Sequence, residues 1–105
     1  MEKLQKLVSE IVRKYDLEVS PELRYIDLES ELGEVGKELL IGNDYGKREF
    51  TNTDNLESEL GDTLFSLICL ANTVDINLEN ALINAIKKYE RRFNKSGSVG
   101  SEFDK

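Results

Sequence analysis

The sequence predicts an all-α fold, and three observations support this. Apolar residues recur at a spacing of three to four, strict alternation of apolar and polar residues is absent, and turn-forming residues divide the chain into four helical segments and a tail. The 105 residues have the length of one ordinary domain. We therefore expect a small four-helix bundle-like domain over residues 1–95 that oligomerises, followed by a disordered tail over residues 96–105.

The first two helices have clear sequence signals. The first is expected over about residues 2 to 16, where one face carries Leu4, Leu7, Val8, Ile11 and Tyr15. The second begins at Ser20 and Pro21, a capping residue followed by the only proline at the first helical position, and runs to about Leu40.

A loop and the third helix follow. Residues 41–53 contain two glycines and no sustained period, so we expect a surface loop long enough to carry a function. Asp54 and Glu57 have the spacing of a capping box, which starts a helix over about residues 55 to 75. This helix is almost continuously apolar from Leu64 and contains the single cysteine, Cys69. We expect it to be the central helix, with Cys69 in the core.

The fourth helix begins after Asn77, which is a capping residue. Its apolar stripe comprises Leu78, Leu82, Ile86, Tyr89 and Phe93. Residues 96–101 read Ser-Gly-Ser-Val-Gly-Ser and end the periodicity, which is why the tail is expected to be disordered.

The composition excludes several classes of function. The net charge of -7 opposes binding to nucleic acid, and the absence of histidine excludes histidine bases, Ser-His-Asp triads and histidine-ligated zinc. Carboxylates must therefore carry any chemistry. The sequence has neither an apolar signal segment nor a stretch long enough to span a membrane, so we expect a cytoplasmic protein with no membrane partner.

A short internal repeat singles out four carboxylates. Residues 28–34 read Leu-Glu-Ser-Glu-Leu-Gly-Glu and residues 56–62 read Leu-Glu-Ser-Glu-Leu-Gly-Asp, so six of seven positions are identical. At about 100° per residue, each repeat places an acidic pair beside the apolar stripe of its helix. The acids of the two helices converge if the helices pack side by side: Glu31, Glu34, Glu59 and Asp62. Close helix approach would also explain Gly33 and Gly61.

Four converging carboxylates indicate a cation, because they repel one another unless a positive charge is present. Oxygen ligands without histidine or a thiolate cluster favour Mg²⁺, for which Mn²⁺ is a plausible substitute. The alternative is that these acids are a solvated helix flank. The repetition of the same neighbours in both helices favours the metal site over that alternative.

The chain resembles MazG-like nucleoside triphosphate pyrophosphohydrolases, members of the all-α NTP pyrophosphatase superfamily, over roughly residues 22 to 93. That family's signature is Glu-Glu-x-x-Glu followed by Glu-x-x-Asp, and here it reads Ser-Glu-Leu-Gly-Glu over residues 30–34 and Glu-Leu-Gly-Asp over residues 59–62. Ser30 replaces the first glutamate. The resemblance implies Mg²⁺-dependent hydrolysis of nucleoside triphosphates, including non-standard or damaged ones, to monophosphate and pyrophosphate. It also implies that the same four acids bind the metal.

Other residues receive roles within this hypothesis. Glu38, one turn beyond Glu34, is a candidate for orienting the attacking water. Lys88 and Arg92 border the apolar stripe of the fourth helix and are candidate phosphate contacts, together with the more outward Arg91. Basic residues in the last turns of a helix also complement its dipole, and that explanation stays open.

Two other interpretations of the sequence compete with the enzyme hypothesis. The first is a non-catalytic helical dimerisation module whose acids are only solvated. The second is a carboxylate-bridged di-iron bundle, which the lack of Glu-x-x-His pairs disfavours. In the enzyme reading the partners are a nucleoside triphosphate and further copies of the chain, in a homodimer or homotetramer.

Overall fold

The computed structural model describes residues 1–96, which form four α-helices. They are α1 (Glu2–Lys14), α2 (Pro21–Gly42), α3 (Leu56–Thr73) and α4 (Leu78–Ser96). There is no strand in this part of the chain, which confirms the predicted all-α class. The predicted tail, beyond Ser96, lies outside the described residues.

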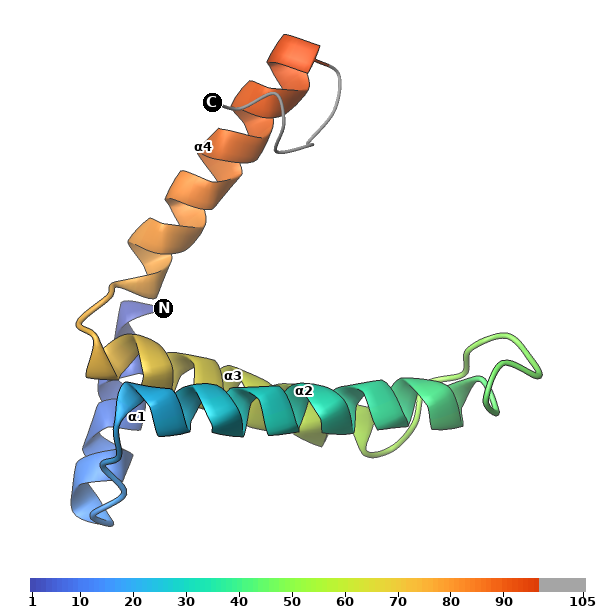
Figure 1. Ribbon diagram of the computed structural model, residues 1–105, viewed down its shortest axis with the longest axis horizontal. Helices are drawn as coiled ribbons and strands as arrows, with labels where there is room; N and C mark the ends of the chain where they lie inside the picture. Colours follow the sequence, from blue (N-terminus) through green and yellow to red (C-terminus); the bar gives the residue numbers. More distant parts are fainter. Residues whose placement is uncertain (97–105) are drawn as a thin grey trace.

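The helices form a body of three and one projecting arm. Helices α2 and α3 run antiparallel and side by side, α1 crosses one end of this pair, and α4 leads away from the same end (Figure 1). Helix α3 packs on both α1 and α2, as expected of the central helix. It carries the buried apolar residues Ile68, Cys69 and Ala71, so the prediction that Cys69 lies in the core is confirmed.

Two of the predicted helix caps form. The hydroxyl of Ser20 accepts a hydrogen bond from the Leu23 N–H at 3.3 Å, and the side-chain oxygen of Asn77 accepts one from the Asn80 N–H at 3.0 Å. Each cap satisfies one of the backbone donors that a helix leaves unpaired at its start. Helix α1 ends two residues earlier than expected, because the chain turns at Asp16 with a φ of 54°.

The predicted capping box of Asp54 and Glu57 is wrong. Asn55 precedes α3 with an α-helical backbone, and no side chain caps the helix there. The backbone carbonyl of Thr53 instead accepts from the Leu56 N–H at 3.4 Å. The helix begins one residue later than predicted, so Asn55 and not Asp54 occupies the N-cap position. Asn55 has helical φ and ψ, whereas a capping residue needs extended ones, and a backbone turn replaces the side-chain cap.

The expected close approach at Gly33 and Gly61 is also wrong within one chain. A Cβ built on either glycine meets no other atom within 4 Å, and both residues are exposed. Gly42 is different, because a Cβ there would meet the Phe50 ring and the Thr51 carbonyl oxygen, the latter at 2.8 Å. The loop after α2 therefore folds back onto the end of that helix.

A buried amide network joins α1 to the junction between α3 and α4. The side-chain amide of Gln5 donates to the Asn72 side-chain oxygen at 3.0 Å and to the Ile76 carbonyl at 2.8 Å, and it accepts from the Leu78 N–H at 2.8 Å. The side-chain amide of Asn72 returns a bond to the Gln5 carbonyl at 2.9 Å. One side chain thus fixes the segment from which α4 departs.

Gln5→Leu keeps the volume of the side chain but removes all three of its hydrogen bonds. Each buried polar group that loses its partner costs about 1–3 kcal/mol, so we expect a melting temperature lower by roughly 10 °C or more. Thermal unfolding followed by circular dichroism measures this. Lys6→Leu, at the adjacent exposed position of α1, is the control. Equal melting temperatures for the two variants would contradict this account of the network.

Helix α4 leaves its apolar side uncovered in a single copy. Leu82 and Phe93 each keep 59% of their surface exposed, and Ile83, Ile86 and Tyr89 are also exposed. Helix α4 contacts the body mainly through α1. Among the described helices, none combines the length and apolar character needed to cross a membrane.

Candidate functional site

The antiparallel packing of α2 and α3 brings acids of the two repeats together. Glu31 of α2 and Glu59 and Asp62 of α3 each offer one carboxylate oxygen, and these oxygens all lie within 4.8 Å of one another. Glu31 and Glu59 are partly buried, whereas Asp62 is exposed. We call these three residues the acidic cluster.

Two further acids act on the acidic cluster through their charge. Partial desolvation, and then the negative charges of Glu34, Asp62, Glu31 and Glu38 in that order, raise the pKa of Glu59 above its ordinary value of 4.5. Glu34, the fourth predicted ligand, thus lies near Glu59 although it is outside the group of three oxygens. No ion pair between described residues involves any of these acids.

Glu38 has a distinct environment. It is buried, with 8% of its surface exposed, and its Oε1 accepts a hydrogen bond from the Thr53 hydroxyl at 2.7 Å. Sequence reasoning missed Thr53. No local signal could have found it, because the contact joins residues 15 positions apart through the fold of the intervening loop.

The predicted basic residues lie elsewhere in a single copy. The Lys88 ammonium and the Arg92 guanidinium lie 5.7 Å and 5.5 Å from the centre of the Tyr89 ring, and Arg91 is exposed on the same helix. Because α4 leads away from α2 and α3, these residues do not join the acidic cluster of their own chain (Figure 1).

Comparison with known proteins places this arrangement in a family. Residues 6–96 match the model of the MazG nucleotide pyrophosphohydrolase domain. The chain belongs to the MazG family. The match begins within α1 and extends over α2, α3 and α4, so it includes both acidic repeats of the sequence.

A relative from Bacillus subtilis (strain 168) supports the assignment to the MazG family. The uncharacterized protein YpjD is 38% identical over 76 residues, which cover 70% of this chain and 67% of YpjD. The crystal structure of YpjD, which is assigned provisionally as a pyrophosphatase, superposes with a TM-score of 0.73 at 33% identity. That alignment covers 88% of this chain and 94% of the other, so the two share their fold over nearly their full lengths.

The acidic cluster of this MazG-family chain suits a hard divalent cation. Its donors are carboxylate oxygens, without nitrogen or sulfur ligands, and such a set favours Mg²⁺ or Mn²⁺ over zinc or copper. The pKa of Glu59 is raised by partial desolvation and then by neighbouring negative charges, and no cation of residues 1–96 forms an ion pair with it. A bound divalent cation would relieve that repulsion.

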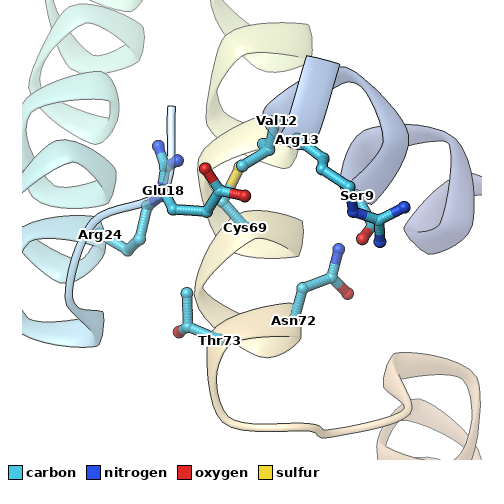
Figure 2. Close-up of a pocket in the computed structure, with 8 residues that line it drawn as sticks. All are labelled: Ser9, Val12, Arg13, Glu18, Arg24, Cys69, Asn72 and Thr73. Atoms are coloured by element: carbon cyan, nitrogen blue, oxygen red, sulfur yellow. The ribbon is translucent and has the colours of Figure 1, made fainter. Parts of the chain in front are cut away.

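A separate pocket of about 180 Å³ lies between α1, the start of α2 and the end of α3, and Figure 2 shows the residues that line it. Arg24 lines this pocket with its Nε atom buried and without a hydrogen-bond partner in the described part of the chain. Burial raises the pKa of the neighbouring Cys69 thiol, which disfavours its thiolate form. None of the acids discussed above lines this pocket.

Proposed function

We propose that this MazG-family chain hydrolyses nucleoside triphosphates to nucleoside monophosphate and pyrophosphate in a Mg²⁺-dependent reaction. The observation that carries the proposal is the convergence of three carboxylates from two repeated motifs within 4.8 Å. The match to the MazG nucleotide pyrophosphohydrolase domain supports the reaction class. Non-standard or damaged nucleotides are included among the proposed substrates.

Four acids would hold the metal in this proposal. Glu31, Glu59 and Asp62 supply the converging oxygens, and Glu34 supplies a fourth carboxylate beside Glu59. When bound, Mg²⁺, or Mn²⁺ in its place, supplies charge neutralisation of the triphosphate and of its transition state. Glu38, buried next to these acids, orients the attacking water.

The phosphate contacts come from a second copy of the chain. Helix α4 carries five basic residues, Lys87, Lys88, Arg91, Arg92 and Lys95, against two acids. The acidic cluster has the opposite charge but lies away from α4 of its own chain. In a homodimer or homotetramer, α4 of one copy covers apolar surface of another and brings Lys88, Arg92 and Arg91 to that copy's bound triphosphate.

The net charge of the chain and its proposed substrate bear on the partners and the location of the protein. With a net charge of -7, nucleic acid is disfavoured as a partner, and the proposed substrate belongs to the cytoplasm. We propose a cytoplasmic enzyme whose partners are its nucleotide substrate and further copies of itself.

Incubation of the purified protein with single NTPs and dNTPs and Mg²⁺ tests the reaction. We expect equimolar nucleoside monophosphate and pyrophosphate, resolved by ion-exchange chromatography, and no product after chelation by EDTA. Restoring Mg²⁺ or Mn²⁺ should restore turnover. Release of inorganic phosphate with nucleoside diphosphate would assign a different bond, and no product from any nucleotide would favour the dimerisation module.

A further inference from the structure

We propose that Thr53 is a positioning residue for this reaction: its hydroxyl holds one oxygen of Glu38 and thereby aims the other oxygen at the attacking water. The inference rests on the proposed function, but it adds a residue that neither the sequence motifs nor the family match assigns. The observation behind it is the 2.7 Å hydrogen bond from Thr53 Oγ1 to Glu38 Oε1.

Glu38 lies on the side of α2 that faces the acidic cluster. It follows Glu31 by seven residues, and seven residues are nearly two full helical turns, so the two side chains share a face of α2. The charge of Glu38 is also among those that raise the pKa of Glu59 on α3. Glu38 contributes no oxygen to the group within 4.8 Å, and its Oε1 is already held by the Thr53 hydroxyl, which distinguishes it from the four proposed ligands.

The hydrogen-bond partner of Glu38, the Thr53 hydroxyl, can orient the carboxylate but does not neutralise its charge. Glu38 has 8% of its surface exposed, and no cation of residues 1–96 forms an ion pair with it. A lysine or arginine in place of Thr53 would offset the negative charge of Glu38, which a water-orienting carboxylate needs. A neutral hydroxyl fixes the plane of the carboxylate and leaves Oε2 able to accept a hydrogen bond from water.

Thr53 is itself held on both sides. Before it, the Thr51 N–H and the Arg48 guanidinium both donate to the Gly42 carbonyl, at 2.9 Å and 2.7 Å, and so tie the loop to the end of α2. After it, the Thr53 carbonyl accepts from the Leu56 N–H at the first residue of α3. Its hydroxyl therefore joins a carboxylate of α2 to the start of the helix that carries Glu59 and Asp62.

Thr53→Val removes the hydroxyl at nearly constant shape and tests the proposal. We expect kcat for pyrophosphate release to fall about tenfold or more while KM stays within about twofold, because the lost contact serves the chemical step. Thr53→Ser, which keeps the hydroxyl, should recover most of the rate. Thr51→Val is the matched control, because the Thr51 hydroxyl forms no hydrogen bond within the described residues.

A double variant establishes whether Thr53 acts through Glu38. If it does, Thr53→Val combined with Glu38→Gln should be no slower than Glu38→Gln alone. Multiplied losses, or a Thr53→Val rate within twofold of wild type, would overturn the proposal. Circular dichroism verifies folding, and Thr53→Ala repeats the comparison should valine not be accommodated.

Mn²⁺ alone gives a readout that does not depend on turnover. Thr53→Val and Glu38→Gln should bind Mn²⁺ within about twofold of wild type but should change the water-proton relaxation of the bound ion to the same extent, because water held by Glu38 is released. Thr53→Ser should restore the wild-type value. If the wild type turns over no nucleotide, the proposed function fails while this comparison still decides the role of Thr53. Unchanged relaxation in Thr53→Val would refute that role even in an active enzyme.

Discussion

Glu59→Gln and Asp62→Asn should each lower pyrophosphate release by a factor of about 100 or more. Either amide keeps the shape of the side chain but removes one negative charge from three carboxylates whose oxygens lie within 4.8 Å of one another. Fewer anionic ligands weaken Mg²⁺ binding and its stabilisation of the transition-state charge, so turnover and metal affinity should fall together. Initial rates at saturating Mg²⁺ and calorimetric titration with Mn²⁺ measure the two effects.

Glu57→Gln is the matched control for these substitutions. Glu57 lies in the first turn of α3 but outside the acidic cluster, and it is exposed. Its amide removes the same charge from the same helix, so turnover should stay near the wild-type level. Wild-type rates for Glu59→Gln and Asp62→Asn, or equal losses in all three variants, would rule out the proposed metal centre.

Glu59→Gln should lower turnover but should not lower the thermal stability of the metal-free protein. Because the pKa of Glu59 is raised in the folded state, its contribution to folding is most favourable below about 4.5 and is lost as the pH rises through the raised pKa. Glu59→Gln removes this loss, so the metal-free variant should melt at the wild-type temperature or above it at neutral pH. Added Mg²⁺ should then raise the melting temperature of the wild type more than that of the variant. Melting curves between about pH 4 and pH 8, with and without Mg²⁺, compare the two.

Leu82→Glu should convert the proposed homo-oligomer into a monomer and abolish most of its activity. Leu82 lies within the exposed apolar stripe of α4, and burying one such side chain contributes about 1.5–3 kcal/mol at each interface where it recurs. A glutamate there would have to be desolvated. If a second copy supplies Lys88 and Arg92, the monomer also lacks its phosphate contacts. Sedimentation at micromolar concentration should show at least twice the chain mass of 12.0 kDa for the wild type, and that single mass for the variant.

Asn84→Glu serves as the control for assembly. Asn84 is exposed two residues further along α4, which places it on the opposite side of the helix from Leu82. Asn84→Glu introduces the same charge on the other side of the helix, so it should leave the sedimenting mass unchanged. A wild type that sediments as a 12.0 kDa monomer would refute the proposed assembly, whatever the variants do.

The sequence determined those features that depend on neighbouring residues along the chain. The three-to-four apolar period predicted four helices, and residues 1–96 form four. Ser20 and Asn77 cap their helices as expected, because a capping bond needs only a side chain and an N–H three residues later. The paired repeat also indicated that α2 and α3 carry matching acids, and Glu31, Glu59 and Asp62 do converge. The prediction failed at the start of α3, where a side-chain cap and a backbone turn were both possible. The backbone turn at Thr53 formed in place of the Asp54 cap.

Tertiary structure alone decided which of these parts meet. Glu38 meets Thr53 across 15 residues, and Gln5 meets Asn72 across 67, through bonds for which no sequence period exists. The Gln5 side chain also bonds Ile76 and Leu78, in the segment from which α4 departs, and α4 carries Lys88 and Arg92 away from the acids of their own chain (Figure 1). Helix propensity and capping act over one or two turns, so they depend only on residues that are close together in the sequence. The meeting of distant side chains depends instead on how loops close and helices pack, which is a property of the whole chain.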